Sequence, residues 1–191
     1  MQNPTHVFFG FFGTLVQCSK GPRGDDHRAS YRLGGRGVRL VGAFRDAYLE
    51  EWSRGVTFIP ELGTMLDDLV SRCRPSVASN THHAPLVTGL LRGAGIAGAF
   101  STVVTSVEFG RRTPCRTIYE HALAVAGSTA GSALFVGDSF VPDYAGPRAV
   151  GMQSLLIDPR ARAPVPVEHR LAHVLDVRER VAAPREVILR V

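Results

Sequence analysis

Two carboxylates follow an apolar stretch of the chain, and one of them, Asp138, is a candidate for acid–base chemistry. Asp138 and Asp143 come after residues 133–136, whose apolar side chains predict a buried strand. An aspartate with a raised pKa in an apolar pocket can serve as a general acid or base, and Asp138 is the best-placed candidate in the sequence. The plainer alternative is that backbone amides of its own loop hold Asp138 in place.

Two histidines follow a second apolar stretch. Ser79 and Asn80 end that stretch, and His82 and His83 come almost directly after them. We expect the histidines near the start of a helix, where the helix dipole lowers histidine pKa and favours the neutral form that accepts a proton. A surface or capping role is the alternative. Asp138, His82 and His83 are therefore the candidate catalytic residues.

Strands and helices alternate along most of the chain and must position these groups. We predict strands at residues 5–11, 76–79, 101–105, 133–136 and 153–157, and helices at 61–72, 84–93, 116–126, 142–150 and 168–175. This alternation predicts an α/β fold with a doubly wound, Rossmann-like parallel sheet. Ligands of such sheets bind at the carboxyl ends of the strands, where the candidate residues lie.

Four segments resemble the motifs of the haloacid dehalogenase (HAD) superfamily. Residues 6–16 resemble the first, 77–80 the second, 106–119 the third and 135–147 the fourth. In that family the first motif reads Asp-x-Asp-x-Thr, and its two aspartates are the nucleophile and the general acid/base. Here those positions hold Gly10 and Phe12, whereas Thr14 keeps the threonine.

The resemblance also implies roles for the other motifs. Ser79 stands where the family hydroxyl binds a phosphoryl oxygen, and Asp138 and Asp143 stand where it places its metal-binding acids. Thr113 replaces the lysine that neutralises the nucleophile, and Lys20 is the only lysine in the chain. The predicted pocket positions are Gly10, Phe12, Thr14, Ser79, Asn80, Thr113, Asp138 and Asp143, with Arg111 and Arg112 as anion-binding candidates.

The missing groups change the expected chemistry. A glycine has no carboxylate to attack phosphorus, and Phe12 cannot protonate a leaving group. Mg²⁺ requires several oxygen ligands, so we expect no cofactor and at most weak Mg²⁺ binding through Asp138 and Asp143. Phe12 also predicts a more apolar pocket than that of a phosphatase.

The family inserts a cap domain after its first motif, and little chain is available for one here. We assign residues 1–16 and 58–191 to a HAD-like core and 17–57 to a small helical cap, with helices at 26–33 and 41–52. A reduced cap leaves the pocket open unless a second subunit covers it. A homodimer is therefore one expectation.

Composition narrows the class of protein. The 191 residues are 45% hydrophobic, enough for a packed core, and no apolar run has the length of a membrane span. The net charge is +5, but the basic residues alternate with acids and apolar residues, which argues against a nucleic-acid surface. Three widely spaced cysteines and the lack of a recognisable secretion signal predict reduced thiols in a cytoplasm. The arginine-rich composition is typical of a GC-rich genome. We also expect a role in bacterial metabolism.

Three functions remain open from the sequence. The first is a HAD-like protein without phosphatase activity, whose pocket binds a small molecule or a protein partner. The second is an enzyme in which Asp138, His82 or His83 moves a proton during isomerisation, cyclisation or hydrolysis of a metabolite. The third is an authentic HAD-type phosphatase.

Overall fold

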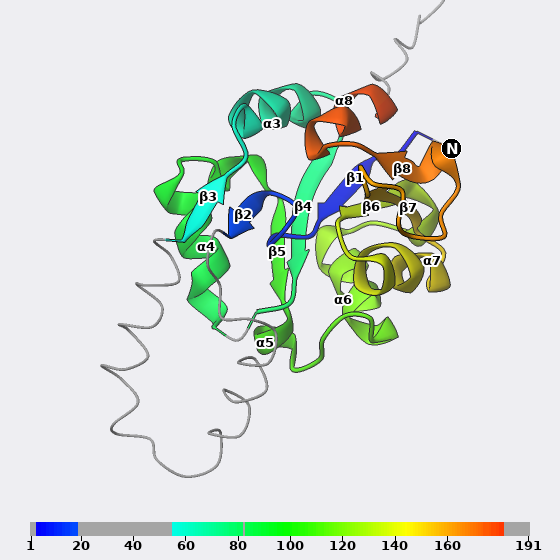
Figure 1. The fold of residues 1–191 in the computed structure, drawn as a ribbon. Coiled ribbons are helices and arrows are strands. Elements are labelled where there is room, and N and C mark those ends of the chain that lie inside the picture. The colour runs from blue at the N-terminus through cyan, green and yellow to red at the C-terminus, as the bar shows by residue number, and fades with distance from the viewer. Residues whose placement is uncertain (1–2, 19–54, 82, 182–191) are drawn as a thin grey trace, which may run out of the picture.

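Six parallel strands form the central sheet of the computed structural model, which describes residues 3–18, 55–81 and 83–181 (Figure 1). The strands are β1 (His6–Phe9), β4 (Arg74–Ser79), β5 (Thr102–Thr105), β6 (Ala133–Gly137), β7 (Gln153–Ile157) and β8 (Arg170–Leu171). Their order is β5-β4-β1-β6-β7-β8, and every neighbouring pair is parallel. The predicted doubly wound sheet is confirmed.

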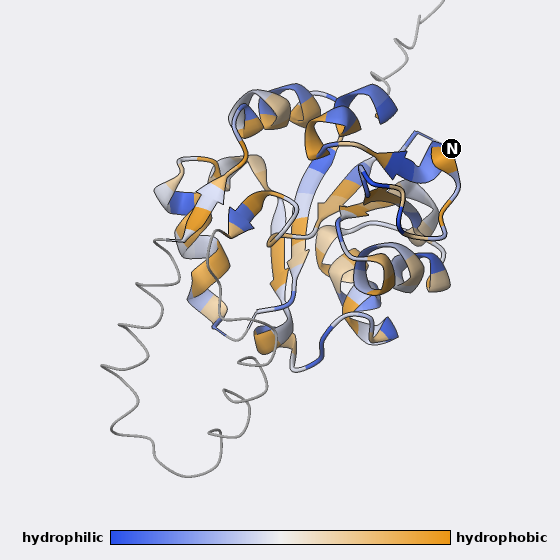
Figure 2. Cartoon of the chain, viewed as in Figure 1, coloured by the Kyte–Doolittle hydropathy of each residue, from blue (hydrophilic) through white to orange (hydrophobic). Residues whose placement is uncertain are grey.

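The first strand lies at the centre of the sheet because its residues are apolar on both faces. Val7, Phe8 and Phe9 are fully buried between β4 and β6. Val7 and Phe9 belong to one core cluster and Phe8 to the other, since successive side chains of a strand point to opposite faces. Figure 2 shows hydrophobic residues on the strands of the sheet and on the helices around them.

Helices cover both faces of the sheet. The helices α3 (Leu62–Val70) and α4 (Ala84–Gly93) pack on the face of Val7, and α6 (Arg116–Ala126) packs on the face of Phe8 (Figure 1). These three helices were expected from the sequence, as were the strands β1, β4, β5, β6 and β7. Further short elements are α5 (Ser106–Phe109) and 3₁₀ turns at Ala97–Ala99 and Ala130–Ser132.

An antiparallel pair of short strands joins the two ends of the predicted cap. The strand β2 (Val16–Cys18) pairs with β3 (Val56–Phe58). The cap helices predicted at 26–33 and 41–52 lie outside the described residues, and the division of the chain into core and cap stays a prediction.

The predicted helix at residues 168–175 is wrong. Two 3₁₀ turns (Val167–His169 and Val174–Asp176) flank β8 there, and α8 (Val177–Arg180) follows. Leu171 is buried and pairs with Ile157 of β7, while the Arg170 guanidinium donates to the carbonyl oxygens of Ala163 and Val165. These contacts at the sheet edge outweigh the local helical pattern.

The helix predicted at residues 142–150 begins earlier and is wider at its start. A π-helical segment (Phe140–Ala145) leads into α7 (Gly146–Ala149). The hydroxyl of Tyr119 donates to the carbonyl oxygen of Pro142, 2.5 Å away, so the N–H of Gly146 bonds one residue further back, to Val141.

No helix among the described residues has the length and apolarity needed to cross a membrane.

Candidate functional site

A pocket of about 130 Å³ opens at the carboxyl ends of β1, β4 and β6. It brings together residues from four separate segments of the chain, as parallel topology predicts. The lining residues are Gly10, Phe11, Phe12, Ala78, Ser79, Asn80, Thr113, Asp138, Ser139, Pro142 and Asp143. Seven of the eight predicted pocket positions therefore meet here, and Thr14 lies directly beneath, hydrogen-bonded to Asp138.

The turn after β1 supports the carboxylate of Asp138. Gly13 has a φ of +78°, and a Cβ at this position would lie 2.3 Å from Oδ2 of Asp138. The buried Thr14 donates its hydroxyl to Oδ1 of Asp138 at 3.4 Å. A side chain at residue 13 would thus displace the carboxylate, so this glycine allows Asp138 to lie against the turn.

The space beside Gly10 faces the second carboxylate. A Cβ on Gly10 would lie 3.7 Å from both carboxylate oxygens of Asp143 and 3.0 Å from Oγ1 of Thr14. A side chain at residue 10 would therefore lie beside Thr14 and the carboxylate of Asp143. Gly10 leaves that volume to the pocket.

Burial raises the pKa values of the two carboxyl groups. Asp143 is only 8% exposed and accepts a hydrogen bond from the N–H of Ser139 at 2.9 Å. Burial, with the nearby charge of Asp138 as a further cause, raises the pKa of Asp143 to about 7. Asp138 is exposed at the pocket mouth, and partial desolvation raises its pKa as well.

The second and third motifs are joined by reciprocal hydrogen bonds. The amide of Asn80 donates to Oγ1 of Thr113 at 2.7 Å and to its carbonyl oxygen at 3.3 Å. In return, Oδ1 of Asn80 accepts the N–H of Thr113 at 3.0 Å. The residue that replaces the family lysine is thereby fixed as part of the pocket wall.

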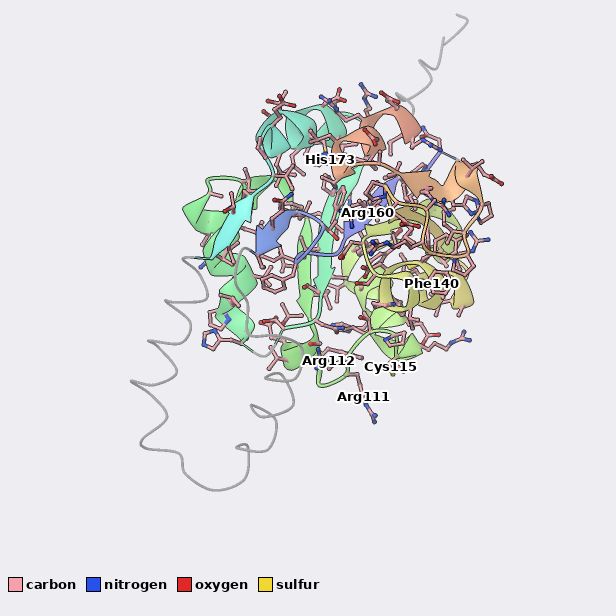
Figure 3. All side chains as sticks on the ribbon, viewed as in Figure 1. Arg111, Arg112, Cys115, Phe140, Arg160 and His173 are labelled. Carbon is pink, nitrogen blue, oxygen red and sulfur yellow. The ribbon has the colours of Figure 1, made fainter. Side chains whose placement is uncertain are left out.

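The remaining candidates that the structure describes lie away from the lining. His83 immediately precedes α4, and its N–H donates to Oγ1 of Thr81, while His82 lies outside the described residues. Arg111 and Arg112 follow α5 and are exposed. Figure 3 shows Arg111 extending away from the body of the protein. None of His83, Arg111 and Arg112 lines the pocket.

Some lining residues were not anticipated from the sequence. Phe11, Ala78, Ser139 and Pro142 complete the wall. Their only sequence signal is adjacency to a motif residue. In residues 3–18, 55–81 and 83–181, no three His, Cys, Asp or Glu side chains gather to hold a metal ion. The pair Asp138 and Asp143 is what the described lining offers to a cation.

Two proteins of known name are similar to this chain in sequence. The human haloacid dehalogenase-like hydrolase domain-containing protein 3 is 37% identical over 123 residues, which cover 57% of this chain and 48% of that protein. A ribulose-1,5-bisphosphate 5-phosphatase from Halopiger xanaduensis is 30% identical over 125 residues, covering 65% and 51% of the two chains. The chain thus spans about half the length of these relatives.

Solved structures share the fold. A HAD phosphatase from Thermococcus onnurineus matches with a TM-score of 0.70 at 18% identity, over 95% of this chain and 99% of that one. The HAD-hydrolase YfnB from Bacillus subtilis, bound to magnesium, matches with a TM-score of 0.72 at 14% identity, over 94% and 99% of the two chains. The family model for haloacid dehalogenase-like hydrolases matches residues 23–151. The chain belongs to the haloacid dehalogenase-like hydrolase family.

Proposed function

We propose that this HAD-like protein binds a small molecule in the pocket at the end of β1 and does not form an aspartyl-phosphate. The observation that carries the proposal is the side-chain-free position at Gly10, directly opposite the carboxylate of Asp143. Nucleophilic catalysis through an aspartate requires a carboxylate at that point. The pocket itself is retained, which supports binding as its role.

Other lining residues are poor replacements for the missing groups. Phe12 has no proton to give a leaving oxygen. Thr113 is neutral and donates or accepts within the Asn80 pair, so it cannot supply the counter-charge of a lysine. No described lining residue is basic. These features argue against phosphoryl transfer, including the activity named for the Halopiger relative.

Weak Mg²⁺ binding is compatible with the proposal. Asp138 and Asp143 are neighbouring carboxylates, and Mg²⁺ sites commonly use one or two carboxylates with water and substrate oxygens. A bound ion would neutralise the two charges and polarise a ligand oxygen. Without a carboxylate at residue 10, we expect affinity too low for the protein to depend on the ion.

Proton transfer by Asp138 is the second candidate function. Asp138 faces the pocket, is exposed to its contents and has a raised pKa, which are properties of a general acid or base. It would act on a metabolite without a covalent intermediate. His82 and His83 remain candidates for a second proton-transfer group.

Incubation of the purified chain with Mg²⁺ and p-nitrophenyl phosphate, and separately with beryllofluoride, tests the main proposal. We expect neither turnover nor an adduct on intact mass measurement. Metal-dependent turnover that Asp138→Asn abolishes, or an adduct on a pocket side chain, overturns it. Conversion of a copurifying metabolite at a rate that falls in Asp138→Asn would instead favour proton transfer.

A second subunit covering the pocket mouth is a further proposal, as is a fixed protein partner. Light scattering during size-exclusion chromatography measures the mass in solution. A monomeric mass at all concentrations would rule out the homodimer. A second protein that copurifies with the chain would be identified as a stable partner.

A further inference from the structure

We infer that the pocket recognises a small ligand through a positively charged nitrogen, such as a primary ammonium, and not through a phosphate. The inference rests on the proposed binding function and names its ligand class. It follows from the charges, the occupied donors, the free acceptors and the space of the described lining.

The charges of the lining have one sign. Asp138 and Asp143 supply two carboxyl groups, and no lysine, arginine or histidine is among the described lining residues. The described ion pairs also leave both aspartates without a cationic partner. A phosphate placed here would meet like charge, whereas an ammonium group would meet opposite charge.

Three of the polar donors that an anion could use are already engaged. The amide of Asn80 donates to Thr113, the N–H of Ser139 donates to Asp143, and the hydroxyl of Thr14 donates to Asp138. Rearranging these bonds would leave buried acceptors without partners, which is unfavourable. The described lining is therefore poorly equipped to hold several phosphate oxygens.

Acceptors, in contrast, retain capacity. An ionised carboxylate has about four lone-pair sites, and the one side-chain hydrogen bond described for Asp138 is the long contact with Thr14, at 3.4 Å. Ser79 is 5% exposed, and its one described hydrogen bond, to the carbonyl of Asn80, has a length of 3.5 Å. This exceeds the ordinary O–H···O range, so a buried hydroxyl in the pocket wall lacks a good partner. An ammonium N–H fits such a group.

The absent side chain at Gly10 provides the room. The position of its Cβ would be equidistant, at 3.7 Å, from the two oxygens of Asp143, so the space beside Gly10 adjoins both of them. Phe12 adds an aromatic residue to the lining, and aromatic faces attract cations. The volume of about 130 Å³ restricts the buried part of the ligand to a small group.

Four small probes of similar size but different charge test the inference. Binding of ethanolamine, ethylene glycol, glycolate and inorganic phosphate to the purified full chain is measured by ligand-detected NMR at pH 8, without added metal. At this pH Asp143, with a pKa of about 7, is mostly ionised and ethanolamine is still protonated. We expect ethanolamine to bind at least about tenfold more tightly than the other three. Asp138→Asn and Asp143→Asn should each weaken ethanolamine binding about tenfold or more, since each removes a charge with little change of shape.

Asp68→Asn is the matched control because Asp68 lies on α3, paired with Arg72 and outside the pocket. It should leave ethanolamine binding unchanged. If Asp143→Asn fails to fold, Asp138→Asn at the pocket mouth carries the comparison. Circular dichroism checks the fold of each variant.

Three outcomes would each overturn the inference. They are preferential binding of phosphate or glycolate, no binding of ethanolamine, and ethanolamine binding that is unchanged in Asp138→Asn. Phosphate binding that appears only with Mg²⁺ would overturn it too. These outcomes differ from failure of the proposed function, which requires a covalent adduct or phosphate-ester turnover. If an anion binds but neither an adduct nor turnover is seen, the ammonium ligand class is rejected while the proposed binding function stands.

Discussion

The side-chain amide of Asn80 and the main chain of Thr113 bind each other in both directions. The N–H of Thr113 donates to Oδ1 at 3.0 Å, and Nδ2 donates to the carbonyl oxygen at 3.3 Å and to Oγ1 at 2.7 Å. The contact connects the loop after β4 with the loop before α6. It fixes one wall of the pocket that Asp138 also lines.

Asn80→Ala should therefore destabilise the protein. The substitution leaves the N–H of Thr113, a buried residue, without its described acceptor, which costs about 1–3 kcal/mol. Urea unfolding measures the loss. Thr88→Ala is the control, because the Thr88 hydroxyl makes one exposed bond within α4 and should matter by less than about 0.5 kcal/mol. Equal effects of the two changes would contradict this role of Asn80.

The raised pKa of Asp143 predicts a pH dependence of stability. Its pKa rises from 3.8 to about 7 on folding, so the folded state holds a proton that the unfolded chain has released. The contribution of Asp143 is most favourable below about pH 4, declines as pH rises to about 7, and is constant above that.

Asp143→Asn should remove this dependence and stabilise the protein at pH 8, because the amide oxygen still accepts from Ser139 without carrying a charge. The free energy of unfolding of both proteins, measured from pH 4 to pH 8.5, provides the comparison. Parallel curves would show that Asp143 does not titrate in this way.

Gly13→Ala should displace Asp138. The new Cβ would lie 2.3 Å from Oδ2 of Asp138, so the carboxylate must swing away, and a φ of +78° adds about 1–2 kcal/mol of strain. Gly110→Ala separates the two effects, since Gly110 has a φ of +80° and nothing within 4 Å of its added Cβ. Both variants should lose stability, but only Gly13→Ala should weaken ethanolamine binding. A crystal structure of the variant with Asp138 unmoved would reject this explanation.

Gly10→Asp should make stability depend on Mg²⁺. The new carboxylate enters beside Asp143 and close to Thr14, and repulsion should cost about 1–3 kcal/mol without metal. A divalent cation would offset the added charge, so melting temperature should rise with millimolar Mg²⁺ much more than in the unsubstituted protein. Gly10→Asn, of equal size and no charge, should lack this response. Similar Mg²⁺ effects in the Asp and Asn variants would refute the prediction.

The sequence predicted the sheet because its central strands are apolar on both faces. Three consecutive apolar residues, Val7, Phe8 and Phe9, predict a strand that is buried on both faces, in the middle of a parallel sheet. The motif residues then meet at the strand ends as a consequence of topology. Local patterns therefore sufficed for α4 and α6, whose apolar faces match their buried residues.

Features that depend on long-range contacts were not predictable in the same way. The helical pattern of residues 168–175 gave way to pairing of Leu171 with Ile157 across the sheet edge. Ser139 and Pro142 line the pocket at the start of the π-helical segment, where Pro142 accepts a hydrogen bond from Tyr119, 23 positions away. The reciprocal bond between Asn80 and Thr113 spans 33 positions and has no local signature.

The hydrogen bond between Tyr119 and Pro142 makes the Tyr119 ring an intrinsic spectroscopic probe of the pocket. The phenol ring is packed edge-on against Phe135 and donates to a carbonyl of the pocket wall. A ligand that shifts Pro142 will alter the asymmetric environment of that ring. Its binding will therefore change the near-ultraviolet circular dichroism signal of the protein. Screening for natural occupants can therefore proceed on unlabelled, unmodified material.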